Sequence, residues 1–190
     1  MKIVIKTWDF FRYDIPYFLK NLWTFRKNLW NWRAWDFSYN LDMLKTGLQQ
    51  LEKSINNSNE ISQTRLKKVQ KIQRCIQLID IILNEMYIDL AEQELGELIS
   101  RDIEIKDVEC GGKKYKQLVD NLTDAEKEHN SKIFNRSIEI EQEIWLEFCQ
   151  IIKGQNQSNF TKLENESDPE KIEQHWWNQF DGSGAKGWWN

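Results

Sequence analysis

Hydrophobic residues recur along the first half of the chain at alternating steps of three and four residues, which is the period of an amphipathic α-helix. The first such segment is predicted to begin at Asp14-Ile15-Pro16, because aspartate can cap a helix and proline is tolerated in its first turn. Its apolar stripe comprises Ile15, Phe18, Leu22, Phe25, Leu29 and Trp32. The spacing predicts that the last four of these residues belong to a Trp-rich core.

Two further stripes predict a long antiparallel helical hairpin of residues 36–56 and 60–98. The first stripe has heptad spacing and stops at a cluster of turn-forming residues, 56–59. The second keeps the three-four spacing as far as Leu90. The two stripes comprise Phe37, Leu41, Leu44, Leu48, Leu51 and Ile55, and then Val69, Ile72, Ile76, Ile79, Leu83, Met86 and Leu90.

The second half of the chain carries shorter patterns. Alternating hydrophobic residues and Gly111-Gly112 predict a minor β-hairpin near residues 102–118, or a single strand there that pairs with residues 3–5. A helix restarts where Thr123 and Glu126 have the spacing of a capping box. Its apolar positions comprise Phe134, Ile138, Trp145, Phe148 and Ile152, with Ile144 and Ile151 beside them. The expected fold class is therefore all-α or mainly α, with additional helices packed against the long hairpin.

Polar stretches divide the chain into three expected parts. Residues 1–153 form a helical domain, residues 154–167 a polar linker, and residues 168–190 a short helix with a Trp-rich C-terminal tail. The short helix should open at Asp168-Pro169 and end at Gly182. The Gly-Ser part that follows is expected to be flexible, so the tail can reach either its own domain or another molecule.

Composition places the chain among globular proteins. Its 190 residues include 40% hydrophobic and 29% charged residues, with a formal net charge of −4. No stretch approaches the roughly 18 apolar residues of a membrane span, and the N-terminus lacks the layout of a signal peptide. A cytoplasmic location is therefore expected. The three distant cysteines, Cys75, Cys110 and Cys149, argue against a disulfide framework.

Four carboxylates give the chain its main resemblance to an enzyme. The motifs Glu94-x-x-Glu97 and Glu104-x-x-Asp107 resemble the acidic helices with which all-α nucleotide pyrophosphohydrolases hold Mg²⁺. The second motif follows the first by only seven residues and falls in an expected loop, so the two cannot occupy facing helices. A solvated acidic face is the favoured interpretation, and a Mg²⁺-dependent all-α nucleotide hydrolase is the alternative.

Histidines and glycines form no catalytic constellation that the sequence identifies. Glu126-x-x-His129 is half of a di-iron motif, but His175 lacks the matching carboxylate. Gly182-x-Gly184 is not expected to cradle phosphate, because it follows no predicted strand and precedes no predicted helix. We therefore expect a non-enzymatic protein that needs neither a metal nor a cofactor.

Aromatic residues are concentrated near the N-terminus, where the charge is also positive. Thirteen of the 24 Phe, Trp and Tyr residues lie between Trp8 and Tyr39, and residues 1–50 carry a net charge of +4. The candidate binding residues of this segment are Arg26, Trp30, Arg33 and Trp35. Such a surface can contact a protein, or it can stack bases while arginine meets phosphate. A Trp-rich core and a membrane-interface helix are the other two interpretations.

The C-terminal region supplies the remaining candidate binding residues, which are Trp176, Trp177, Trp188 and Trp189. An indole gains nothing by staying in water, and exposed tryptophans are typical anchors of interfaces. These residues are therefore expected to dock, either internally with the aromatic first helix as the receiver, or on a partner or a second copy of the chain.

The aromatic segment and the C-terminal Trp pair together resemble small Trp-rich helical proteins encoded by tailed bacteriophages. The resemblance lies in YFLKNLWTFRKNLWNWRAWDFSYNLDMLKTGLQQLEKSI and in Gly187-Trp188-Trp189-Asn190. It implies a viral accessory protein in the cytoplasm of a bacterial host, where inhibition of a host defence system or capture of a host signal is the expected role. It supplies no functional residues.

The sequence therefore favours the binding of a host or viral protein through aromatic surfaces, which needs no phosphate cradle and suits an acidic chain. The alternative is a protein that binds a nucleotide-derived signal or nucleic acid in a basic aromatic pocket. The positive first quarter and the interleaved Arg and Trp residues favour that alternative. Homo-oligomerisation is left open.

Overall fold

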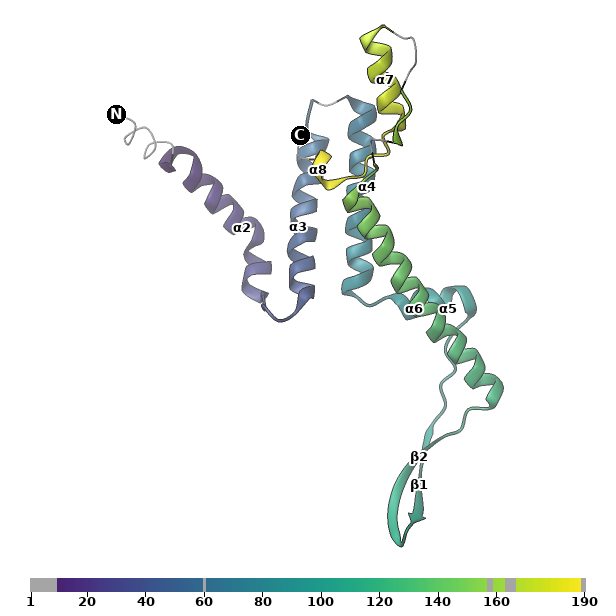
Figure 1. Cartoon of the computed structure of the whole chain (residues 1–190). Helices are drawn as coiled ribbons and strands as arrows, with labels where there is room; N and C mark the ends of the chain where they lie inside the picture. The colour runs from purple at the N-terminus through teal and green to yellow at the C-terminus, as the bar shows by residue number, and fades with distance from the viewer. Residues whose placement is uncertain (1–9, 60, 157–158, 163–166, 189–190) are drawn as a thin grey trace. The chain divides into compact units, whose positions relative to one another are not determined.

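The computed structural model describes residues 10–59, 61–156, 159–162 and 167–188 (Figure 1). Its elements are the π-helix η1 (Phe10–Asp14), the helices α2 (Ile15–Asn31), α3 (Phe37–Asn56), α4 (Ser62–Leu83) and α5 (Tyr87–Leu95), the strands β1 (Ile103–Cys110) and β2 (Lys113–Asp120), and the helices α6 (Asp124–Lys153), α7 (Pro169–Gln179) and α8 (Ala185–Trp188). The prediction of a mainly α fold with a minor β-hairpin is confirmed.

Contacts between residues divide the chain into two compact units. One unit comprises Met1–Leu83 and Glu147–Asn190, and the other comprises Asn84–Leu146. Helix α6 contributes residues to both units. The C-terminal segment thus belongs to the same unit as α2, α3 and α4, and the unit boundaries differ from those that the polar stretches suggest.

The core of the first unit is the hairpin of α3 and α4, which run side by side in opposite directions (Figure 1). Helix α3 begins after Asp36, whose carboxylate accepts a hydrogen bond from the backbone N–H of Ser38 at 2.9 Å. An ion pair between Lys45 and Asp80 joins the two helices. Their buried hydrophobic residues are Leu41, Leu48, Leu51, Ile55, Val69, Ile72, Cys75, Leu78, Ile79 and Ile82.

The helix expected over residues 60–98 is interrupted, so the prediction was wrong in its length. Helix α4 ends at Leu83, and Glu85 adopts a φ of +50°, in the left-handed region that cannot continue a right-handed helix. Helix α5 then begins at Tyr87. The hydrophobic spacing continues across the break, and periodicity alone therefore could not reveal it.

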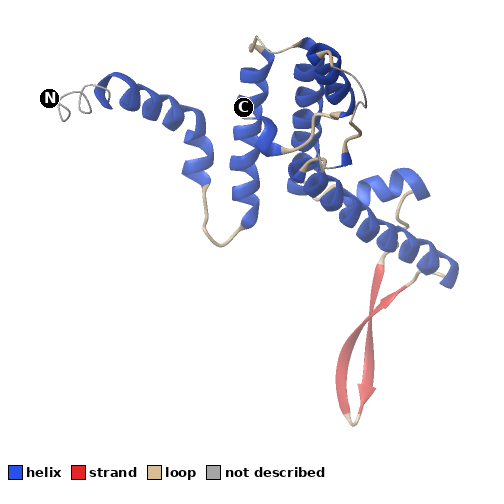
Figure 2. Ribbon diagram, turned by 45° about the horizontal axis from the view of Figure 1, so that its top comes forward, coloured by secondary structure: helices blue, strands red, loops and turns tan. Residues whose placement is uncertain are grey.

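In the second unit, Gly111-Gly112 connects β1 to β2. Both glycines have positive φ, +59° and +75°, as the two central residues of a type I′ turn require. The register pairs Cys110 with Lys113 at the turn, and Figure 2 shows the two strands as a single hairpin. Residues 3–5, the alternative partner of a strand here, lie outside the described residues.

Helix α6 begins with the predicted capping box. The backbone N–H of Thr123 donates to the Glu126 carboxylate at 2.7 Å, and the N–H of Glu126 donates to the Thr123 hydroxyl oxygen at 3.3 Å. Arg101 also donates to this carboxylate. The hydrogen bonds from Arg101 and Thr123 lower the pKa of Glu126 to about 2.

The buried side of α6 differs from the expected one. Phe134 and Ile138 are 47% and 53% exposed, which corrects their assignment to the apolar side. Ser137 lies among the buried residues, where its hydroxyl donates to the Phe134 carbonyl oxygen at 2.8 Å. Because Ser137 interrupts the hydrophobic residues of the buried side, the side that carries Phe134 and Ile138 appeared more hydrophobic in the sequence. The buried residues are Ile133, Ser137, Ile140, Ile144, Phe148 and Ile151.

Replacing Ile72 by alanine tests the core of the helical hairpin. Ile72 is fully buried, so Ile72→Ala should lower the free energy of unfolding by about 2–5 kcal/mol. Leu66 is 55% exposed on the same helix and is the matched control, for which we expect a loss of less than about 1 kcal/mol. Urea denaturation followed by circular dichroism measures both values. Equal losses would contradict the assigned core.

Candidate functional site

Helix α2 contacts α3 through its polar side. Asn28 is buried, its side-chain N–H donates to the Asp42 carboxylate, and its side-chain oxygen accepts a hydrogen bond from the Thr46 hydroxyl at 3.2 Å. The indole N–H of Trp32 donates to the side-chain oxygen of Asn40 at 3.3 Å. Because a buried amide needs partners for its donor and acceptor atoms, these bonds hold the polar side of α2 against α3.

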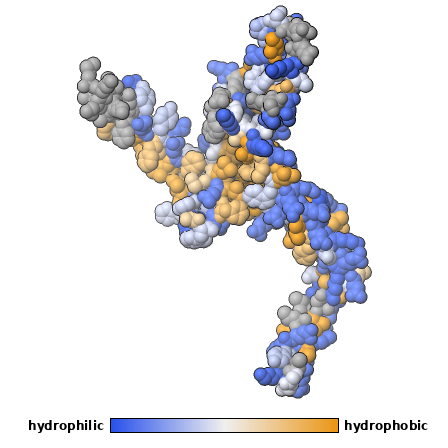
Figure 3. Space-filling view, viewed as in Figure 1, coloured by the Kyte–Doolittle hydropathy of each residue, from blue (hydrophilic) through white to orange (hydrophobic). Residues whose placement is uncertain are grey.

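The apolar side of α2 consequently faces solvent. In a helix of 3.6 residues per turn, Leu19 lies opposite Asn28, and Trp23 and Trp30 lie beside Leu19. Trp23 is 69% exposed and Trp30 is 87% exposed, and Figure 3 shows hydrophobic residues on the visible surface of α2. The exposed apolar residues on this side, which we call the α2 aromatic face, are Phe18, Leu19, Leu22, Trp23, Leu29 and Trp30.

This orientation corrects the core assignment made from spacing. Leu22, Leu29 and Trp32 are 45%, 47% and 43% exposed, whereas Phe25 is half-buried. The three-four spacing located the apolar stripe of the helix. The hydrogen bonds of Asn28, which the spacing does not register, place the opposite side against α3.

Arg26 lies within the α2 aromatic face. Its guanidinium carbon is 4.0 Å from the centroid of the Trp23 ring, and the same group donates to the Trp23 carbonyl oxygen. The expected interleaving of Arg and Trp is thus realised by this pair, which forms a preorganised cationic and aromatic surface beside Trp30.

Arg33 and Trp35 lie just beyond the C-terminal end of α2. Arg33 donates to the carbonyl oxygens of Asn31 and Trp32 at 3.1 and 2.9 Å, so its side chain is held at the end of the helix. Trp35 is 83% exposed. The structure therefore exposes all four candidate residues of this segment, Arg26, Trp30, Arg33 and Trp35. Trp8, which the aromatic count included, lies outside the described residues.

A groove of about 700 Å³ separates parts of α2 and α3. Tyr17 and Phe25 line it from α2, Leu51 and Ile55 line it from α3, and Trp188 lines it from the C-terminal segment. Trp188, which is 3% exposed, thus lies at a groove that α2 also lines, within the same unit of the chain.

Residues 180–188, which we call the C-terminal clasp, pack within the first unit. Phe180, Ser183 and Trp188 are buried, and the indole N–H of Trp188 donates to the Gly182 carbonyl oxygen at 2.7 Å. The Gly-Ser segment, for which flexibility is the prediction, is thus packed against its own unit in the structure. Trp189, the last candidate residue, lies outside the described residues.

Close backbone contacts explain why glycine occupies the clasp. Gly182 has a φ of +89°, and a Cβ at this position would lie 2.2 Å from the Lys67 carbonyl oxygen. A Cβ on Gly154 would lie 2.4 Å from the Cα of Gly184. The backbone N–H of Gly184 donates to the Ile151 carbonyl oxygen at 2.8 Å, which fixes the clasp to the end of α6.

Charged groups fasten the clasp to α4. Lys67 donates to two backbone carbonyl oxygens at the end of α7, at 3.0 and 2.7 Å. Lys71 pairs with Asp181 at 3.3 Å. Burial disfavours the charged form of Asp181, but hydrogen bonds from Ser183 and Lys71 outweigh it, so the pKa of Asp181 lies below its ordinary value.

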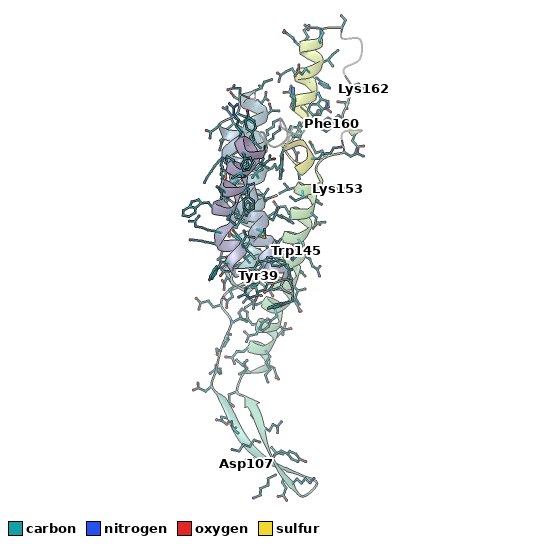
Figure 4. All side chains as sticks on the ribbon, turned by 90° about the vertical axis from the view of Figure 1, so that its left-hand side faces the viewer. Tyr39, Asp107, Trp145, Lys153, Phe160 and Lys162 are labelled. Atoms are coloured by element: carbon teal, nitrogen blue, oxygen red, sulfur yellow. The ribbon has the colours of Figure 1, made fainter. Side chains whose placement is uncertain are left out.

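Trp176 and Trp177 belong to an aromatic cluster on α7. The ring centroid of Trp176 lies 5.5 Å from that of Phe160, which Figure 4 labels, and 5.7 Å from that of Phe180. The Trp177 ring meets the Trp176 ring edge-on at 4.5 Å. These two tryptophans pack against the residues that lead into the clasp and do not extend the α2 aromatic face.

The carboxylate motifs considered for Mg²⁺ are distributed over different elements of the second unit. Glu94 lies on α5 and accepts a hydrogen bond from Arg136 at 2.6 Å, whereas Glu104 and Asp107 lie on β1. His129 contacts the Glu97 carbonyl oxygen at 3.1 Å. In the described part of the chain, no three His, Cys, Asp or Glu side chains gather as a metal site requires.

No family model matches the chain, and neither a curated protein nor a solved structure is significantly similar to it. Among the described helices, none combines the length and the apolar character needed to cross a membrane. The candidate site is therefore interpreted from its own geometry.

Sequence reasoning missed the side of α2 that contacts α3, and with it the central place of Trp23. A signal was present, because Tyr17, Asn21, Thr24 and Asn28 recur at steps of four, three and four residues. A helix with one regular apolar side and one regular polar side can place either side against a neighbouring helix. In the structure, Asp42 and Thr46 lie opposite Asn28 and bond the polar side of α2 to α3.

Two matched tryptophan substitutions separate the clasp from the α2 aromatic face. Trp188 is 3% exposed, so Trp188→Ala should lower the free energy of unfolding by about 3–5 kcal/mol. Trp30 is 87% exposed, and Trp30→Ala should change it by no more than about 0.5 kcal/mol. Thermal and urea unfolding of the full chain measure both effects. A loss at Trp30 as large as that at Trp188 would show that α2 is oriented the other way.

Proposed function

We propose that the chain is a non-enzymatic binding protein that recognises a protein partner through the α2 aromatic face. The observation that carries the proposal is the solvent exposure of Trp23 and Trp30 on a helix whose polar side is turned inward. Aromatic side chains in contiguous exposed patches are the usual anchors of protein interfaces. With the resemblance to phage proteins, the proposed role is that of an accessory protein that binds a host or viral protein and inhibits a host defence system in the bacterial cytoplasm.

The size of the face suits such a role. Large aromatic side chains each bury roughly 150–250 Å² when covered, and a standard interface buries about 800 Å² on each partner. Three aromatic residues, Phe18, Trp23 and Trp30, together with the leucines of the face therefore approach the area that a stable complex requires.

Charge indicates the chemistry of the partner. Lys20, Arg26, Lys27 and Arg33 lie between Asp14 and Asp36, and this segment contains no acidic residue. A partner that offers an apolar stripe bordered by carboxylates would be complementary to it. The chain as a whole carries a net charge of −4, so such a partner would be directed toward α2 rather than toward the rest of the protein.

Nucleic acid or a nucleotide is the second candidate ligand of the same face. It is favoured by the stacking of Arg26 on Trp23, because an indole beside a guanidinium can stack a base and contact its phosphate. Binding of this kind weakens steeply with salt, because phosphate contacts release counterions. An aromatic protein interface depends far less on ionic strength.

Site-specific photocrosslinking in bacterial cells tests the proposal. A photoreactive phenylalanine analogue at position 30 should crosslink the full chain to a discrete protein, and the analogue at position 66 on α4 should not. Once that protein is purified, Trp23→Ala and Trp30→Ala should each weaken its binding by about 30-fold, the loss typical of an interface anchor. Leu66→Ala, also at an exposed position, should leave the affinity unchanged.

The same measurements distinguish the two ligand classes. A crosslinked species that survives nuclease treatment and an affinity that changes little with salt support the protein partner. A nuclease-sensitive species, with affinity for oligonucleotides that falls steeply as salt rises, would replace it with the nucleic-acid alternative. Equal crosslinking from positions 30 and 66 would refute a role for the α2 aromatic face.

A further inference from the structure

A second cavity, of about 480 Å³, lies where the end of α6 meets the C-terminal clasp. It is within the size range of small-molecule sites. Glycine and amide groups dominate its lining, two lysines contribute the charge, and none of the described lining residues is acidic. These residues are Lys153, Gly154, Gln155, Asn156, Phe180, Ser183, Gly184, Lys186 and Gly187.

The glycine contact of the clasp brings the two lysines to this cavity. Lys153 is the last residue of α6, labelled in Figure 4, and Lys186 lies on α8, more than thirty residues later in the chain. Gly154 directly follows α6, and Gly184 directly precedes α8. The two glycines lie so close together that a side chain on Gly154 would collide with Gly184. The close backbone approach therefore brings both lysines to the lining of one cavity.

Within the part of the chain that the structure describes, neither lysine has a carboxylate partner of the kind that Lys45 and Lys71 have. Lys45 pairs with Asp80 and Lys71 pairs with Asp181, but no described carboxylate forms an ion pair with Lys153 or Lys186. Asp181, the acidic residue of the clasp, is engaged by Lys71 and Ser183 and does not line the cavity. In a chain with a net charge of −4, a cavity whose described lining holds two lysines and no carboxylate is suited to an anion.

The glycine motif of the clasp also differs from its sequence-based interpretation. Gly182-x-Gly184 was not expected to precede a helix, yet it leads directly into α8, on which Lys186 lies. Gly182 lacks a side chain that would collide with the backbone of α4, whereas Gly184 lines the cavity. The segment thus combines two glycines of positive φ with a lysine two residues after the second glycine.

We propose that this cavity binds a diphosphate group, free or as part of a phosphate ester, between the ammonium groups of Lys153 and Lys186. Two separate cations favour an anion with more than one charged phosphate, because each lysine then meets its own phosphate. Phe180 supplies an apolar wall, and Gln155 and Asn156 supply amides at the rim. The site is independent of the α2 aromatic face and of its partner.

Such a ligand would stabilise the clasp. It would connect the end of α6 to α8, which carries the buried Trp188. Ligands that bind the folded state alone raise the melting temperature in proportion to the logarithm of their concentration. Binding should therefore be visible as a rise in melting temperature as well as in calorimetry.

Calorimetry and thermal unfolding of the full chain test the proposal, with inorganic pyrophosphate, adenosine 5′-diphosphate and adenosine as probes at low salt. We expect pyrophosphate, the nucleotide or both to bind at one site and raise the melting temperature, and adenosine to do neither. Binding of pyrophosphate alone would identify a site for the free anion, and tighter binding of the nucleotide would identify a site for a phosphate ester. Both results support the diphosphate site.

Lysine substitutions provide the decisive comparison. Lys153→Gln and Lys186→Gln should each weaken binding by about tenfold, because each removes a charged hydrogen bond to phosphate. Lys132→Gln, the same exchange at an exposed position of α6, should leave the affinity unchanged. Equal affinity of all three variants, or no binding of either phosphate compound to the intact chain at millimolar concentration, would overturn the proposal.

Discussion

The hydrogen bonds of Asn28 with Asp42 and Thr46 determine which side of α2 faces solvent. Each bond contributes roughly 1 kcal/mol, whereas each large apolar side chain left in water forgoes about 1.5–3 kcal/mol of burial. Six such side chains make up the α2 aromatic face, so the chain keeps a hydrophobic surface on α2 whose burial would be favourable. The proposed partner would cover this surface.

The tryptophans that the structure describes therefore differ in their surroundings from one part of the chain to another. Trp176, Trp177 and Trp188 pack within the first unit, where they support the C-terminal clasp. Trp23, Trp30 and Trp35 remain in solvent at α2 and just beyond it. The clasp fixes the unit through glycine contacts that tolerate no side chain, so the buried tryptophans differ from those that we propose for recognition.

The sequence predicted those features of the fold that depend on residues close together in the chain or on a regular spacing. The capping box of Thr123 and Glu126, the type I′ turn at Gly111-Gly112 and the heptad seams of α3 and α4 all involve neighbours in sequence or a simple period. The break at Glu85 and the packing of Gly182 against α4 depend on the surrounding tertiary structure, which a single sequence does not display. For the candidate site, the aromatic and cationic residues were identified, but the side of α2 that faces solvent was not.

Hydroxyl-radical footprinting of the monomeric full chain tests the orientation of α2 most directly, because it reports the solvent exposure of each indole separately. We expect Trp23 and Trp30 to be oxidised nearly as fast as in the urea-unfolded chain, and Trp188 to be strongly protected. Protection of Trp23 and Trp30 to the level of Trp188 would contradict the account, since it would place the apolar side of α2 against the core.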